Sequence, residues 1–215
     1  MAENESGNEL EKLIVENILD IEAAIARARD RLDDRLWDEM GEVVNEAVPA
    51  EDWDKECEGA GASFWLRNWG SGNPCDARFY FVIDKNDIGK EKRYTWLARS
   101  VSENDSPYES LALYFSQKVV APESVKLIYE QQKSLLETLR KNGFRLDNGL
   151  WLYMPFTFKK EILAQAYKNG DFSEALQPLK EAVGKVFENR QQFEKLAEAF
   201  DAAADTAKKA VQGGN

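Results

Sequence analysis

The sequence predicts an α+β fold in which a long N-terminal helix and C-terminal helices pack on an antiparallel β-meander of about four to five strands. Apolar residues recur every three or four positions over residues 9–47, which is typical of a helix. Residues 62–69, 77–84 and 94–101 are rich in aromatic and β-branched residues, and turn-forming stretches separate them. This pattern favours three strands joined by hairpins.

The remaining elements follow in order along one domain, residues 9–211, between a disordered polar start at 1–8 and a tail at 212–215. Alternating apolar residues in Glu109–Gln117 predict a further strand, and Pro122 suits the first turn of a helix. Asp147-Asn148-Gly149 predicts a hairpin turn before the apolar strand 150–156. The expected elements are a long helix, a meander, a helix, a hairpin with its strand, and final helices, at residues 9–47, 62–117, 122–142, 144–158 and 159–211.

Composition excludes several classes of function. The formal net charge of −11 opposes binding of a phosphate backbone by a basic surface. The absence of histidine excludes His-dependent catalytic triads and His-based zinc sites, so we predict neither a cofactor nor a metal site and lean against an enzyme. Only Cys57 and Cys75 are present, and the start of the chain does not resemble a signal peptide. We therefore expect a soluble cytoplasmic protein.

The long helix carries a narrow apolar seam of the coiled-coil kind, with charged residues elsewhere around it. One interpretation is that the seam packs along its own domain. The other is that it binds a protein partner or a second copy of the chain, which the length of the helix favours. The candidate partner-binding residues are Ile14, Ile18, Ile21, Ile25, Leu32 and Leu36.

The meander carries a second candidate surface. Period-two alternation assigns Phe64, Phe81 and other apolar residues to a core face. The opposite face mixes aromatic rings with arginines, which are typical of binding hot spots. Its residues are Trp65, Arg67, Trp69, Arg78, Tyr80, Tyr94 and Trp96. The alternative is that a helix covers this face and the arginine stems pack over the rings.

Carboxylates suggest two weaker possibilities. The segment 51–61 is acidic but lacks the ligand spacing of a calcium loop, so we interpret it as a solvated connector. A divergent metal-dependent nuclease needs acids on two neighbouring strands and a lysine two residues after the second acid. Asp76 and Asp84 instead lie at the two ends of one predicted strand, and Lys85 comes one residue too early. An acidic inhibitor that mimics nucleic acid is a further alternative.

The order of elements and several aromatic motifs also resemble the non-catalytic C-terminal region of some bacterial and phage PD-(D/E)xK nuclease-superfamily proteins. The motifs are Leu36-Trp37, Phe64-Trp65-Leu66, Leu150-Trp151-Leu152-Tyr153 and the segment 169–183. The nuclease core itself is missing, so no catalytic residue carries over. The resemblance implies an accessory role in a defence or mobile-element setting, and our leading hypothesis is a non-enzymatic protein-interaction module.

Overall fold

The computed structural model describes residues 2–57, 61–70, 72, 75–83, 95–101 and 111–212, and it confirms the α+β class. The strands form one six-stranded sheet in the order β1-β2-β3-β4-β6-β5, and every neighbouring pair is antiparallel. The strands are β1 Trp53–Glu56, β2 Ala62–Leu66, β3 Phe79–Ile83, β4 Leu111–Gln117, β5 Arg145–Asp147 and β6 Trp151–Phe156.

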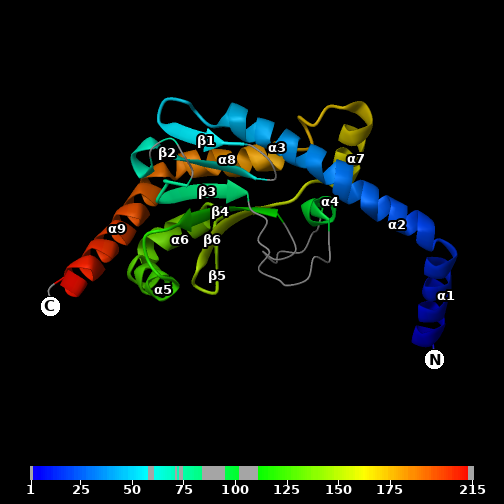
Figure 1. Ribbon diagram of the computed structural model, residues 1–215, viewed down its shortest axis with the longest axis horizontal. Helices are drawn as coiled ribbons and strands as arrows, with labels where there is room; N and C mark the ends of the chain where they lie inside the picture. Colours follow the sequence, from blue (N-terminus) through cyan, green and yellow to red (C-terminus); the bar gives the residue numbers. More distant parts are fainter. Residues whose placement is uncertain are drawn as a thin grey trace.

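Helices surround this sheet and extend beyond it (Figure 1). Arg67–Trp69 forms a single 3-10 turn, and Ala28–Leu32 is a π-helical segment between α2 and α3. The α-helices are α1 Ala2–Glu16, α2 Ile18–Arg27, α3 Asp33–Ala47, α4 Trp96–Ser100, α5 Pro122–Gln131, α6 Lys133–Lys141, α7 Lys160–Asn169, α8 Gln177–Glu188 and α9 Arg190–Gln212.

The core lies on one face of the sheet, where period-two alternation gathers the apolar side chains. Phe64 lies opposite Phe81, and Phe81 lies opposite Phe115, so three central strands each contribute a buried ring to this face. From α9, Phe193 packs edge-on against Phe81 with 4.7 Å between ring centroids, and Phe200 lies 6.1 Å from Phe79. The predicted core face is therefore confirmed, and the C-terminal helices close it.

The boundary between α3 and the sheet is fixed by polar contacts as well as by packing. Leu36, Met40 and Val44 of α3 are fully buried at a spacing of four residues, which places them on one side of the helix. After the helix ends, the Lys55 ammonium of β1 donates to the carbonyls of Asn45 and Val48. These bonds tie the last turn of α3 to the edge strand.

The structure corrects four details of the sequence prediction. The third predicted strand, residues 94–101, is wrong, because Trp96–Ser100 forms α4. The acidic connector contains a strand, β1, that the sequence analysis treated as a linker. The predicted helices 9–47 and 122–142 are each interrupted, the first at Asn17 and the second at Gln132. Helix α1 begins at Ala2, within the start that we expected to be disordered.

Candidate functional site

The first two helices form an arm that projects from the body of the molecule. We call residues 2–27, helices α1 and α2, the N-terminal arm. In Figure 1 the arm leaves the body at the end opposite the C-terminal part of α9. Every residue from 8 to 27 is exposed except Ile21, which is half-buried, and α2 contains no buried residue. The arm therefore contributes nothing to the core described above.

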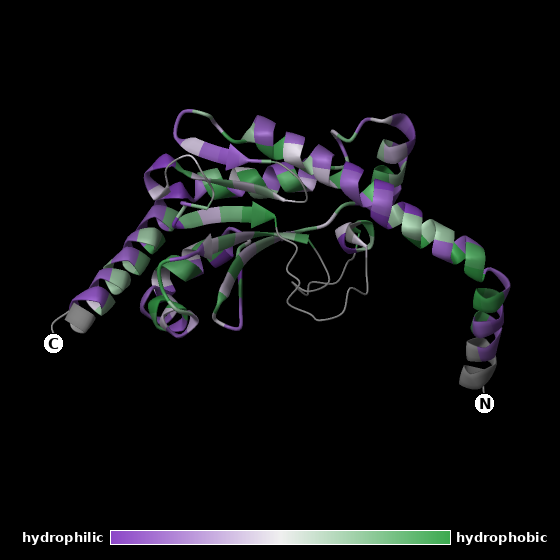
Figure 2. Ribbon diagram, viewed as in Figure 1, coloured by the Kyte–Doolittle hydropathy of each residue, from purple (hydrophilic) through white to green (hydrophobic). Residues whose placement is uncertain are grey.

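The arm carries an unusual amount of apolar surface for a solvent-exposed helix (Figure 2). Among the described residues, seven of the eight exposed large apolar side chains lie between positions 10 and 25, and the eighth is Leu127 of α5. Leu19 is 82% exposed and Val15 is 73% exposed. The other five are Leu10, Leu13, Ile14, Ile18 and Ile25. Exposed apolar residues gathered on one segment are typical of interaction surfaces in folded proteins.

Local contacts explain where the arm begins. Asp33, at the start of α3, is buried, and its carboxylate accepts a hydrogen bond from the backbone N–H of Leu97 in α4 at 2.9 Å. The Tyr167 hydroxyl of α7 donates to the Leu32 carbonyl at 2.6 Å. Arg35 lies over the Phe172 ring, 4.8 Å from its centroid. The helix is thus held from Leu32 onward and leaves the body before that residue.

These contacts divide the predicted seam into two parts. Leu36 is completely buried in the core of its own domain, so it cannot bind a partner, and Leu32 is half-buried beside α7. Ile14, Ile18 and Ile25 are exposed, and Ile21 is half-buried. The interpretation of packing within the domain therefore holds for the C-terminal part of the seam, and an apolar stripe without a described contact remains on the arm.

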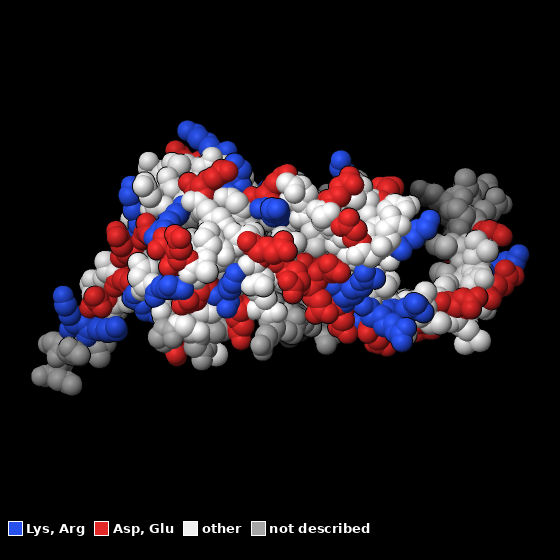
Figure 3. Space-filling view, turned by 90° about the horizontal axis from the view of Figure 1, so that it is seen from above, with Lys and Arg blue, Asp and Glu red and all other residues white. Residues whose placement is uncertain are grey.

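Charge is distributed unevenly along the arm and its junction with the body. Residues 8–22 contain five carboxylates and one lysine, whereas Arg27, Arg29 and Arg31 follow within five residues. All three arginines are exposed, and none of them forms an ion pair with a described carboxylate. Basic side chains gather where the arm meets the body in Figure 3. The outer part of the arm is thus acidic, and its inner end, where it joins the body, is basic.

The predicted aromatic and arginine face of the sheet is not assembled as one surface. Trp65 is fully buried, and Trp69 lies in the 3-10 turn after β2 with its ring among the core residues, 5.7 Å from Phe79. Tyr80 is on the expected face of β3, half-buried, with the Lys118 ammonium 4.7 Å from its ring centroid. Trp96 belongs to α4, and Tyr94 and the Trp96 side chain lie outside the described part of the structure.

The two arginines assigned to that face hold loops in place. Arg67 donates to the Asp54 carboxylate at 3.1 Å and to the Ala50 carbonyl at 2.6 Å, which fixes the segment leading into β1. Arg78 donates to the Asp201 carboxylate of α9 at 2.6 Å. These arginines are occupied by contacts within the chain, so the face offers fewer binding groups than the sequence suggests.

The structure instead reveals an aromatic cluster that the sequence analysis did not single out. On the face opposite the core, Tyr114 of β4 stacks on Tyr153 of β6 with 5.7 Å between ring centroids, and both are buried beside Ala112. The registered pairing of these strands places the two tyrosines directly opposite each other. The alternation within each strand could have indicated this face, but the pairing of β4 with β6 depends on the topology.

The carboxylate hypotheses find no support in the described residues. Asp52 pairs with Arg190 at 2.6 Å and Asp54 pairs with Arg67, so two acids of the connector serve structural ion pairs. No group of three or more His, Cys, Asp or Glu side chains within the described part of the chain is arranged to hold a metal ion. Of the nuclease template, Asp76 is exposed, whereas residues 84–86 lie outside the described residues.

Comparisons with protein-family models, curated proteins and solved structures found no match to this chain. The resemblance to the nuclease-associated region therefore remains a prediction. Within the described residues, no helix has both the length and the apolar character required to cross a membrane.

Proposed function

We propose that this protein is a self-associating interaction module and that the N-terminal arms of two copies bind each other. The observation that carries the proposal is the apolar stripe on the arm, which no described element of the same chain covers. Burying a Leu or Ile side chain contributes about 1.5–3 kcal/mol, so a stripe of several such residues favours association strongly. Few cysteines favour a reducing, cytoplasmic setting for this association.

Charge selects a second copy in antiparallel orientation as the occupant. In a parallel pair the acidic outer parts would lie side by side and repel each other. In an antiparallel pair centred between Asn17 and Ile18, Leu10 of one copy is level with Ile25 of the other, and Ile14 is level with Ile21. The same register brings the acidic outer part of each arm level with the inner end of the other arm, where Arg27 lies. The arm is therefore complementary to itself under two-fold symmetry, as closed dimers require.

An accessory role of this kind agrees with the layout resemblance noted in the sequence. A module without a catalytic site would contribute by bringing copies of its host protein or complex together. The defence or mobile-element setting that the resemblance implies belongs to the same proposal.

Matched variants on two sides of the arm test the proposal. Ile14→Ser with Ile18→Ser removes two residues of the stripe, whereas Val15→Ser with Leu19→Ser makes the same kind of change about 100° further round the helix. Val15 and Leu19 are the more exposed pair, so non-specific apolar attraction would give them the larger effect. We expect the first pair to weaken dimerisation strongly and the second to leave it nearly unchanged.

The expected size follows from the exposed fraction. Ile18 is 42% exposed, so its serine variant forfeits about 1 kcal/mol per copy and about 2 kcal/mol per symmetric dimer, or roughly 30-fold in the dissociation constant. Light scattering across a dilution series measures this shift, and circular dichroism shows whether the arm remains helical. A wild-type monomer at all concentrations would overturn the proposal, and equal loss in both variant pairs would overturn the assignment of the interface to the stripe.

A further inference from the structure

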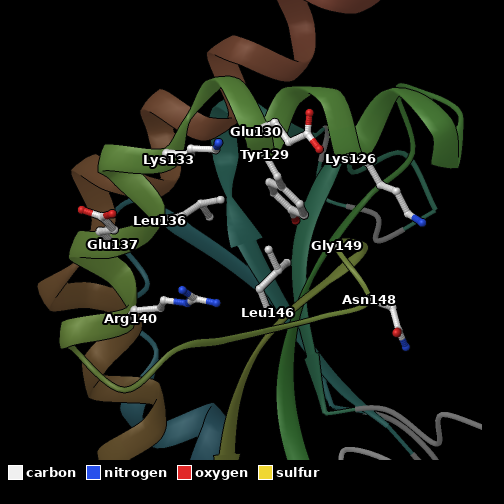
Figure 4. Close-up of a pocket in the computed structure, with 10 residues that line it drawn as sticks. All are labelled: Lys126, Tyr129, Glu130, Lys133, Leu136, Glu137, Arg140, Leu146, Asn148 and Gly149. Atoms are coloured by element: carbon white, nitrogen blue, oxygen red, sulfur yellow. The ribbon is translucent and has the colours of Figure 1, made fainter.

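Helices α5 and α6 and the β5–β6 hairpin line an open hollow of about 440 Å³. No residue of the N-terminal arm lines it. Its floor is apolar and consists of Leu136, Leu146 and the ring of Tyr129. The volume is in the range typical of sites for small ligands. Figure 4 shows Leu136 and Leu146 pointing into this space from the helix and from the hairpin.

Cationic side chains surround this apolar floor. Lys126 of α5 and Lys133 and Arg140 of α6 line the hollow, together with the carboxylates Glu130 and Glu137. Figure 4 shows Lys133 and Arg140 extending into the hollow, whereas Glu137 turns away from it. None of the three cations forms an ion pair or a side-chain hydrogen bond with another described residue. Their charges are thus available to a ligand.

The hydroxyl of Tyr129 adds a hydrogen-bond donor at the hollow. Tyr129 is only 3% exposed, its side chain forms no hydrogen bond with any described residue, and its ring extends from α5 into the hollow (Figure 4). The hydroxyl is therefore able to donate to an acceptor that binds in the hollow. Burial raises the pKa of Tyr129, so the hydroxyl stays protonated and able to donate a hydrogen bond at neutral pH.

We propose that this hollow binds a small organic anion with an apolar body. Lys133 and Arg140 would bind the anionic head group, the Tyr129 hydroxyl would donate to it, and Leu136 and Leu146 would contact the apolar part. A carboxylate, sulfonate or phosphate head satisfies this chemistry equally, because each presents several acceptor oxygens to the two cations. The site is independent of self-association through the arm.

Fluorescent naphthalene probes test the site directly. The anionic probe 8-anilinonaphthalene-1-sulfonate matches the proposed chemistry, and N-phenyl-1-naphthylamine has the same aromatic body without the sulfonate. In full-length protein, Lys133→Gln with Arg140→Gln is expected to weaken binding of the sulfonate about tenfold and to leave binding of the neutral probe unchanged. Tyr129→Phe keeps the ring and is expected to weaken binding of the sulfonate probe severalfold.

Lys141→Gln is the control, because it removes the same charge from an exposed position of α6 that does not line the hollow. Equal weakening by Lys141→Gln and by Arg140→Gln would show a general effect of net charge and would overturn the proposal. Sulfonate binding that is the same in wild type and in the double variant, or absent in wild type, would also overturn it. Circular dichroism of each variant shows that a loss of binding does not come from unfolding.

Discussion

Replacing Phe193 by alanine tests whether the C-terminal helix closes the core. Phe193 is fully buried, and its ring centroid lies 4.7 Å from that of Phe81, 5.3 Å from that of Phe115 and 5.1 Å from that of Phe144. Truncation of a buried phenylalanine costs about 3–5 kcal/mol through lost transfer free energy and the cavity that remains. Three aromatic contacts are lost at once, so we expect a loss of about 4–5 kcal/mol, near the upper limit.

Urea unfolding followed by circular dichroism measures this loss as a shift of the midpoint at constant slope. Leu19→Ala is the control, because a change on the arm away from the stripe is expected to alter the free energy of unfolding by less than about 0.5 kcal/mol. A loss below about 2 kcal/mol for Phe193→Ala would mean that the site collapses easily, and it would refute the assignment of α9 as the element that closes the core.

Three further outcomes follow from charge and burial. Glu9→Arg is expected to weaken self-association slightly at low salt and to have no effect at high salt, because Glu9 lies on the side of the helix away from the stripe and acts only through long-range charge, as measured by sedimentation equilibrium. Burial raises the pKa values of Tyr129 and Tyr167 above the unfolded value near 10, so stability is retained below that pH and lost above it, by about 1.4 kcal/mol per pH unit for the buried Tyr129 and by less for the half-buried Tyr167. Tyrosinate absorbance is expected to rise for these two only as the protein unfolds. Asp33→Ala leaves an α4 amide without its acceptor and is expected to cost about 1–3 kcal/mol by thermal or urea unfolding.

The sheet was predictable where propensity and burial agree. In β3, buried apolar residues alternate with half-buried ones, and β2 is rich in buried aromatic and apolar residues. The same propensity misled the analysis for residues 94–101, because β-forming residues there are recruited into a helix. Thr95 caps α4 by accepting from the Ala98 N–H at 3.1 Å, and Asp33 of a distant helix accepts from Leu97. The second contact is long-range and leaves no local pattern.

The interaction surface was predictable only in part. Spacing identified the apolar seam, but whether Leu36 is buried depends on the packing of α3 against α8 and the sheet, which the sequence of the helix does not contain. The hollow beside α5 and α6 was not predicted. Its cations lie on the helices and Leu146 lies on a hairpin, so only the tertiary fold brings them together.

The mass of the full-length protein in solution, measured by light scattering at low and at high salt, tests the central claim most directly. Antiparallel arms joined by an apolar stripe predict twice the mass of the 24.5 kDa chain under both conditions, because salt screens the attraction between the acidic and basic parts of the arms but not apolar burial. A monomer at both salt concentrations would contradict self-association through the arm. A dimer that dissociates completely at high salt would contradict the apolar stripe as its main source of stability.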